Sequence, residues 1–379
     1  IHLYMRFSDI PGLKEEKKRL ISFYKSGKIH HALLFFGKEG SGNLPLALAF
    51  ATYLNCEKKI ENDSCGECPS CIKMQKLIHP DLHLIFPVAS SPKITKEVIS
   101  DKFVESWRIS FMENPYMNLK DWFEVCGIEN RKPNISKDEA KNIIKKLILK
   151  PFQSKQKINL IWLPEYMHNT TANALLKIFE EPPGDTLFFL VSNNHQKLLK
   201  TIISRVQMFK VNNFESIDIK KYLSKYQEKS VQEIDSAIFL SDLSINAAEK
   251  ILLDSKDDNL SFLKDWLRNC YSENFLEINN KMEWFNNLSK MSKRAFLHYS
   301  LKLMRESLVS KIETSLVKVS TEEEKFINNF KKTLDKDSLA DIILLFDNSI
   351  SNLDGNANPK ILFLNLSIKL SNFFQTVKT

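Results

Sequence analysis

Cysteine supplies the first pattern in this sequence that could do chemistry. Four of the six cysteines fall in one short stretch with the spacing C-x8-C-x2-C-x2-C, at Cys56, Cys65, Cys68 and Cys71. The two C-x2-C steps let thiolates converge from a single turn, and four thiolates complete a tetrahedral zinc site with no open position. The alternative is four thiols that lie near one another by chance. Because the spacing is that of a metal site and no export signal is present, we predict a structural zinc ion.

The two remaining cysteines and one histidine do not belong to such a cluster. Cys126 and Cys270 are isolated in the sequence, and we interpret both as ordinary thiols. His79 begins the tripeptide His-Pro-Asp, where we interpret it as a turn residue rather than a ligand. The sequence offers no pattern typical of a nucleophile with its base, of a paired-carboxylate active site or of a redox cofactor.

A glycine-rich stretch, G-K-E-G-S-G-N-L at Gly37–Leu44, has the spacing of a phosphate-binding loop. The glycines are present at Gly37, Gly40 and Gly42, but Asn43 stands where a lysine would reach the phosphates. Leu44 replaces the serine or threonine that would ligate Mg²⁺, and a leucine side chain cannot ligate a hard cation. The stretch is either an ordinary glycine-rich turn or a degenerate phosphate loop, and its flanks favour the second.

Those flanks alternate between buried strands and helices. Apolar runs predict strands at His31–Phe36, Lys157–Leu163 and Leu187–Val191, and a helix follows the loop at Pro45–Leu54. Such alternation from about residue 5 to 210 predicts an α/β domain with a parallel sheet. Between about 92 and 133 lies a segment rich in aromatic and charged residues, which we interpret as an insertion without a clear role; its aromatic residues include Trp107, Phe111, Tyr116, Trp122 and Phe123.

The second half of the chain is predicted to be helical. Strand signals fade after about residue 213, and apolar residues recur at helical spacing. One predicted face carries Leu297, Leu301, Met304 and Leu308, and another carries Leu339, Ile342, Ile343 and Phe346. Asn358–Lys360, with proline in the first turn, starts a last helix whose apolar face we predict at Ile361, Leu364, Ile368 and Phe373.

Composition agrees with a multidomain protein that is rich in helices. The chain has 379 residues, of which 43% are hydrophobic and only 9 are glycine. Its net charge of +8, from 54 basic and 46 acidic residues, is spread along the chain without a basic stripe, which favours a solvated surface. No apolar run reaches the roughly 20 residues that span a bilayer. We interpret Ile1–Tyr4 as an upstream extension before Met5, and we expect a cytoplasmic protein without a membrane partner.

Several strings resemble the bacterial DNA polymerase III clamp-loader subunits of the AAA+ superfamily. They are FSDIPG at Phe7–Gly12, HALLF at His31–Phe35, ANALLKIFEEPP at Ala172–Pro183 and the dipeptide Ser204–Arg205. The helix within the third string has an apolar face at Leu175, Leu176 and Phe179. The resemblance covers roughly residues 5–90 and 135–210, is thin in the helical half, and excludes the insertion.

The resemblance implies an architecture and a set of partners. It implies an AAA+ domain at 5–212 that contains the zinc module (56–71) and the insertion, a helical lid at 213–258 and a C-terminal collar at 259–379 that joins subunits. In this family a pentameric loader opens a ring-shaped sliding clamp and closes it on primed DNA. The implied partners are ATP-hydrolysing motor subunits and a delta subunit, with the clamp and primed DNA met through the complex. The family also carries a zinc module after the phosphate-loop helix.

Within the family, the sequence looks like the delta-prime type, a stator that lacks a working ATP site. The strand that ends in Asp-Glu in AAA+ ATPases here has Trp162 and Leu163 at those places, and Glu165 comes two positions late. In the family, the arginine of a Ser-Arg-Cys motif points across the subunit interface to the γ-phosphate. Ser204 and Arg205 match that motif, with Val206 in place of cysteine. The alternative for Arg205 is a surface residue paired with a nearby acid.

Two other functions remain open at this point. One is an active AAA+ clamp-loader ATPase that uses Glu165 with a relocated cation, against which Asn43 and Leu44 argue. The other is a zinc protein that binds DNA without partners, which the four cysteines and the positive charge permit. Nucleotide turnover by the isolated chain separates the first from the stator, and DNA binding with and without loader partners separates the second.

Overall fold

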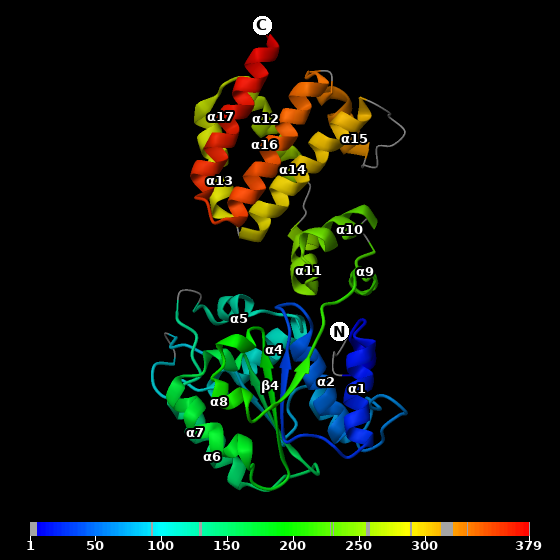
Figure 1. Cartoon of the computed structure of the whole chain (residues 1–379), viewed down its shortest axis with the longest axis vertical. Coiled ribbons are helices and arrows are strands. Elements are labelled where there is room, and N and C mark those ends of the chain that lie inside the picture. The colour runs from blue at the N-terminus through cyan, green and yellow to red at the C-terminus, as the bar shows by residue number, and fades with distance from the viewer. Residues whose placement is uncertain are drawn as a thin grey trace. The chain divides into compact units, whose positions relative to one another are not determined.

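The protein is described by a computed structural model, which covers residues 6–91, 94–128, 131–227, 229, 231–254, 258–288, 290–311, 321–331 and 333–378 (Figure 1). The chain forms two compact units. The first combines Ile1–Gln227 with Asp242–Ala247, and the second combines Glu228–Ser241 with Ala248–Thr379. The division into AAA+, lid and collar domains stays a prediction, and the extension Ile1–Tyr4 lies outside the described residues.

A five-stranded parallel sheet forms the centre of the first unit. Its strands are β1 (Ala32–Phe36), β2 (Leu82–Ile85), β3 (Lys157–Trp162), β4 (Thr186–Ser192) and β5 (Gln207–Lys210), in the order β2-β3-β4-β1-β5. Each neighbouring pair runs parallel. The predicted α/β class is therefore confirmed. The three predicted strands are β1, β3 and β4, whereas β2 and β5 have only four residues each and gave no apolar run long enough to recognise.

Besides this sheet, the first unit contains α-helices and short 3-10 helices. They are η1 (Phe7–Asp9), α1 (Lys14–Lys25), α2 (Asn43–Asn55), α3 (Pro69–Gln75), η2 (Ser100–Phe103), α4 (Val104–Glu113), α5 (Leu119–Cys126), α6 (Lys137–Ile148), η3 (Pro164–Tyr166), α7 (Asn169–Glu180), η4 (His195–Lys197), α8 (Lys200–Ile203) and α9 (Ser216–Leu223). Phe188 of β4 packs edge-on against Phe179 of α7, and the next residue, Phe189, stacks on Phe50 of α2. Because successive strand residues point to opposite faces, α7 and α2 lie on opposite sides of the sheet.

The predicted insertion is a packed aromatic cluster. Its described residues are 94–128 and 131–133, and the first of these stretches contains η2, α4 and α5. Trp107 of α4 stacks between Phe86, which follows β2, and Phe111, at centroid distances of 5.1 and 5.5 Å. Trp122 of α5 is fully buried and donates from Nε1 to the Pro87 carbonyl at 2.9 Å. The aromatic side chains that had no clear role in the sequence are thus the core that fixes this segment beside the sheet.

The second unit is helical throughout its described residues, as predicted. Its helices are α10 (Val231–Leu240), most of α11 (Ile245–Asp254), α12 (Asp258–Tyr271), α13 (Phe275–Asn287), α14 (Lys290–Ser310), α15 (Thr321–Phe330), α16 (Lys336–Asp354) and α17 (Pro359–Lys378). Trp266 of α12 stacks on Phe363 of α17 at 4.6 Å and donates to the Ser367 hydroxyl at 2.9 Å. Among the described residues, no helix is long and apolar enough to cross a membrane.

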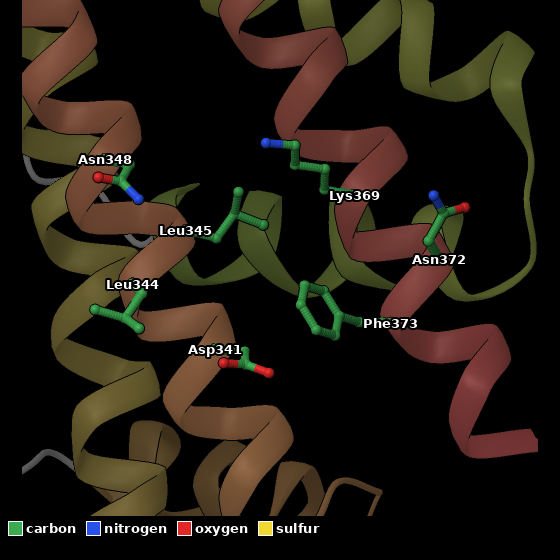
Figure 2. A pocket seen from close by; sticks show the side chains of 7 residues that line it. All are labelled: Asp341, Leu344, Leu345, Asn348, Lys369, Asn372 and Phe373. Carbon is green, nitrogen blue, oxygen red and sulfur yellow. The ribbon is translucent and has the colours of Figure 1, made fainter.

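The predicted apolar face of α17 is correct only in part: Leu364 and Phe373 are partly buried against the helical core, whereas Ile361 and Ile368 are not. Ile361 and Ile368 are 68% and 49% exposed, whereas the residues buried in the core are Leu362, Phe363, Leu366, Leu370 and Phe374. The helix carries two neighbouring apolar stripes, and the sequence could not show which of them meets α12 and α13. Part of the other stripe borders a groove of about 510 Å³ between α16 and α17, lined by Asp341, Leu344, Leu345, Asn348, Lys369, Asn372 and Phe373 (Figure 2).

Candidate functional site

The four clustered cysteines converge as the spacing predicts. Their sulfur atoms all lie within 4.8 Å of one another. The Sγ of Cys65 lies 3.6 Å from that of Cys56 and 3.8 Å from that of Cys71. Thiolates about 2.3 Å from a tetrahedral zinc ion are about 3.8 Å apart, so the spacing fits one ion of that kind. The cluster Cys56, Cys65, Cys68 and Cys71 could therefore hold a metal ion.

Backbone hydrogen bonds place these sulfur atoms. Cys56 terminates α2, and Cys68 is the N-cap of α3, whose first residue is Pro69. The N–H groups of Cys65 and Cys68 each donate at 3.3 Å to the sulfur of the preceding cysteine in the cluster. The N–H of Cys71 donates to the Cys68 sulfur at 3.4 Å. Donors aimed at sulfur favour the thiolate, which is the form that binds metal.

The thiols differ in how readily they ionise. Burial opposes ionisation of Cys65, but the backbone N–H groups of Glu67 and Cys68 outweigh it and lower the pKa of this thiol to about 6. Burial raises the pKa of Cys56 and of Cys71. The buried thiols therefore hold their protons until a cation compensates their charge, and metal binding must release protons.

Asp63 ties the cysteine module to the start of the chain. Its carboxylate accepts the backbone N–H of Phe7 at 3.0 Å and of Ser8 at 2.9 Å. Gly66 has a φ of +77°, and a β-carbon there would lie 3.2 Å from the Arg6 side chain. The module is thus part of the packing around η1, so loss of a bound ion would be felt beyond the cysteines.

The glycine-rich stretch lies between β1 and α2, at the carboxyl end of the sheet. Gly40 and Gly42 have φ values of +88° and +77°, which an L side chain rarely adopts. The amide of Asn43 donates from Nδ2 to the Ser192 carbonyl at 3.2 Å and to Asn193 Oδ1 at 3.3 Å. Leu44 is buried, only 5% exposed. Of the two side chains at the motif's lysine and hydroxyl positions, that of Asn43 thus bonds to groups beyond β4, and that of Leu44 packs in the protein interior.

The end of β3 is likewise occupied by apolar packing. Trp162 is the last residue of β3, is 2% exposed and packs edge-on against Trp107 at 6.0 Å. Leu163 follows with a φ of +54° and is also buried. Both side chains at this end of β3 are therefore buried, and neither offers a ligand atom for a cation.

Glu165 holds a neighbouring loop. Its Oε1 accepts the backbone N–H of Asn193 at 3.0 Å and of Asn194 at 3.1 Å, just beyond β4. Burial raises the pKa of this carboxyl. The carboxylate lies close to the phosphate loop through Asn193, which also meets Asn43. Its observed contacts are those of a residue that positions backbone.

Arg205 pairs with an acid of its own chain. Its Nε donates to Glu180 Oε2 at 3.0 Å, and its Nη1 donates to the Thr201 carbonyl at 3.1 Å. Ser204, the C-cap of α8, donates its hydroxyl to the same carbonyl at 3.2 Å. The Arg205 side chain is 32% exposed and that of Glu180 is 58% exposed, so the ion pair is a surface one and is individually weak.

The other residues singled out in the sequence lie outside these sites. His79 accepts the Asp81 backbone N–H at Nδ1, and Asp81 in turn accepts three N–H groups from Phe152, Gln153 and Ser154. Burial raises the pKa of Cys126 and of Cys270 to about 12, in keeping with unreactive thiols.

The sequence did not predict one group of polar residues near the phosphate loop. Asn118, Asp121 and Asn246 form hydrogen bonds there. Isolated Asn and Asp residues form no recognisable sequence motif. The one sequence feature that pointed to Asn118 and Asp121 is their place in the aromatic insertion.

Known proteins similar to this chain are replication proteins. A family model described as "DNA polymerase III, delta subunit" matches residues 12–215. The delta' subunit of DNA polymerase III from Escherichia coli K12 is 27% identical over 200 residues, which cover 52% of this chain and 47% of that subunit. The delta' subunit from Bacillus subtilis 168 is 27% identical over 243 residues, covering 64% and 59%. A gamma subunit from Buchnera aphidicola of Schizaphis graminum is 27% identical over 229 residues, covering 60% and 51%. The chain thus spans about half the length of the curated relatives it matches.

Solved structures align over nearly the whole chain at low similarity. A DNA polymerase III gamma subunit-related protein from Thermotoga maritima aligns with 95% of this chain and 99% of its own, with 15% identity and a TM-score of 0.37. The DNA clamp loader delta protein of Bacillus subtilis aligns with 94% and 99%, with 12% identity and a TM-score of 0.30. Scores this low carry no argument about function.

The cysteine cluster predicts one zinc ion per chain. The purified protein should contain about one equivalent of zinc, and the double variant Cys68→Ser/Cys71→Ser should contain none because two of four ligands are lost. Acidification should release the metal, since protons compete for the thiolates. Metal analysis of the desalted protein measures both effects, and Cys126→Ser is the matched control. Stoichiometric zinc in the double variant would place the ligands elsewhere.

Proposed function

Since this chain belongs to the DNA polymerase III delta-subunit family, we propose that it is a non-catalytic, delta-prime-type stator of a clamp loader. In that role it assists the ATP-dependent loading of a sliding clamp onto primed DNA. The observation that carries the proposal is the pair of replaced motifs inside the family match, with Asn43 and Leu44 in the phosphate loop and Trp162 and Leu163 at the end of β3.

The replaced side chains remove the charges that phosphoryl transfer needs. Such transfer relies on a lysine at the β- and γ-phosphates and on Mg²⁺ held by a hydroxyl and a carboxylate. Here an amide that bonds to the Ser192 carbonyl replaces the lysine, and buried Leu44 and Trp162 replace metal ligands. Loss of one such charge stabiliser usually costs orders of magnitude in rate, and here all are missing. The domain then serves as a scaffold.

We assign zinc as the ion of the cysteine module, in a structural role. Four sulfur ligands leave no position open for substrate or water. The module joins the end of α2 to α3 and holds Phe7 and Ser8 through Asp63. Zinc would therefore stabilise the face of the first unit on which η1 packs.

A role for Arg205 at a neighbouring subunit would explain why a subunit without a working ATP site retains an AAA+ domain. We propose that Arg205, with Ser204 beside it, acts in trans on the ATP site of a neighbouring motor subunit. A guanidinium near the γ-phosphate can be worth roughly 10³–10⁵ in rate because it neutralises charge that develops during transfer. The exposed pair with Glu180 is weak enough to be exchanged for a phosphate at an interface.

The similarity to gamma subunits supports one alternative function, that of an ATP-hydrolysing motor subunit. Their similarity matches that of the delta' subunits, at 27% identity in both cases. A motor subunit would bind and hydrolyse ATP itself, so turnover by the isolated chain separates the two. A zinc protein that binds DNA without partners is a further alternative, distinguished by DNA binding in the absence of the loader.

The stator role predicts an obligate place in a complex. Co-expression with the motor and delta subunits of the same organism should yield an assembly that contains this chain and loads clamps onto primed DNA. Omission of the chain should reduce loading. Size-exclusion chromatography and a clamp-loading assay measure both. Loading at full rate without the chain, or no association with the motor subunits, would contradict the proposal.

The isolated chain should not hydrolyse ATP. Phosphate release by protein free of other loader subunits should stay at background, because the phosphate loop and the end of β3 lack every charged group that the reaction needs. The variant Glu165→Gln serves as the control, since Glu165 is the acid that an active site with a relocated cation would use and its carboxylate lies just beyond β4. Robust turnover that this substitution abolishes would mean that the chain is a motor subunit.

Arg205→Ala should lower ATP turnover by the assembled loader without preventing assembly. The loss should fall mainly at the one site that Arg205 faces, and Arg205→Lys should restore activity only in part, since an ammonium lacks the planar two-pronged geometry. Lys200→Ala is the matched control, because it removes a positive charge from α8, which ends just before Arg205. Steady-state ATPase and loading rates of the reconstituted complex measure the effect. An unchanged rate in Arg205→Ala would leave only the surface ion pair with Glu180.

A further inference from the structure

The inserted segment, residues 94–128, reaches the phosphate loop. Asn118, the N-cap of α5, donates from Nδ2 to the Glu39 carboxylate at 2.9 Å. The same Asn118 forms a capping box with Asp121, whose Oδ2 accepts the Asn118 backbone N–H at 3.0 Å. The cap that starts α5 is therefore also the contact with the loop, so the position of the helix and of the loop are linked.

The inserted segment also holds a second stretch, Asp242–Ala247, which returns to the first unit from far along the chain. We name it the return segment. Asn246 is 4% exposed and its amide is satisfied on both sides by the inserted segment. Its Nδ2 donates to Asp121 Oδ2 at 2.7 Å, and its Oδ1 accepts from Asn114 Nδ2 at 2.8 Å. Loss of either partner would leave a buried amide group without its hydrogen bond, which is costly.

The return segment lies directly against the loop. A β-carbon on Gly40 would lie 2.4 Å from the Ser244 hydroxyl oxygen and 3.0 Å from the Ser244 α-carbon. A β-carbon on Gly42 would lie 2.5 Å from the ring of Phe214. Tyr116 of the inserted segment packs edge-on against that same ring at 5.7 Å. Loop glycines are thus needed here for close packing of protein on protein.

We propose that the inserted segment is an internal latch, which fastens the return segment to the degenerate phosphate loop and makes this part of the chain independent of nucleotide. A ligand shifts a conformational equilibrium only by binding its two states differently. Here Asn114, Asn118 and Asp121 supply from within the chain the contacts that tie the loop to the segment beside it. The latch goes beyond the stator role, because it is a property of the isolated chain.

The latch explains why the insertion and the loss of charged groups occur together. Trp107 of the inserted segment packs on Trp162, so an acid at position 162 would lie beneath an indole in a dry site. Asn43 turns its amide to the Ser192 carbonyl, away from a phosphate role. A sequence that had kept the charged residues could not bury them in this way without large cost.

Hydrogen exchange of the full-length chain, followed by mass spectrometry, tests the latch. The decisive variant is Asn114→Ala, because it lies in the inserted segment while the readout is the exchange of residues 37–46 and 242–250. Loss of a hydrogen bond in a buried network should speed exchange there by about tenfold. Asn246→Ala should speed exchange at least as much, because it also removes the bond to Asp121 Oδ2. The double variant should fall short of the sum of the two effects, because both substitutions remove the Asn114–Asn246 bond.

Asn142→Ala is the matched control. Asn142 also bonds carboxylates of the first unit, Asp101 at 2.9 Å and Glu139 at 3.4 Å, but neither belongs to the loop or the return segment. It should leave exchange at 37–46 and 242–250 unchanged. Excess Mg²⁺–ATP should not change the exchange of these residues, either in the unmodified chain or in the variants.

Two outcomes would overturn the latch. Unchanged exchange at 242–250 in Asn114→Ala would show that the inserted segment does not hold the return segment. Slower exchange of the unmodified loop on addition of Mg²⁺–ATP would show that nucleotide still binds there. If Asn246→Ala does not fold, Asn114→Ala decides the question, because its side chain is only partly buried. Failure of the chain to join a loader would leave both results untouched, so the two proposals fail separately.

Discussion

The parallel direction of the sheet is the constraint on which the rest of the first unit depends. Because all five strands point the same way, their carboxyl ends meet at one edge. The glycine-rich loop follows β1, the aromatic stack of the insertion begins just after β2, Trp162 ends β3, and Asn193 follows β4. Residues far apart in sequence therefore share one site. Packing at that edge buries the side chains of Asn43, Leu44, Trp162 and Leu163.

The cysteine cluster lies apart from the glycine-rich loop and has different contacts. The cysteines sit where α2 ends, a short distance along the chain from the loop but outside the network of Asn43, Asn193 and Glu165. Its sulfur ligands form a closed set, and its contacts through Asp63 run to η1. A closed four-ligand ion stabilises structure and does no chemistry. The first unit thus combines this set of sulfur atoms with buried apolar and amide side chains at the edge of the sheet.

In the proposed stator role, the first unit would act through its fixed geometry and through one exposed charge. The proposed latch joins the return segment through Asn246 and the loop through Asn118. Arg205 lies in a different part of the first unit, and its side chain is partly exposed. A stator of this kind would contribute a fixed geometry to an assembly whose other members respond to nucleotide. The two features are independent, because no described hydrogen bond of Arg205 involves the inserted segment.

The sequence by itself determined those features whose signal lies in neighbouring residues. Apolar runs located β1, β3 and β4, cysteine spacing predicted the convergence of four sulfur atoms, and the replaced motif positions were readable directly. Tertiary structure decided the rest. It brought in the four-residue strands β2 and β5 through pairing with longer neighbours, and it selected which of two apolar stripes of α17 enters the core. It also joined Asn114 to Asn246, 132 positions apart, because a hydrogen bond between isolated polar residues has no local pattern and exists only once the chain has folded.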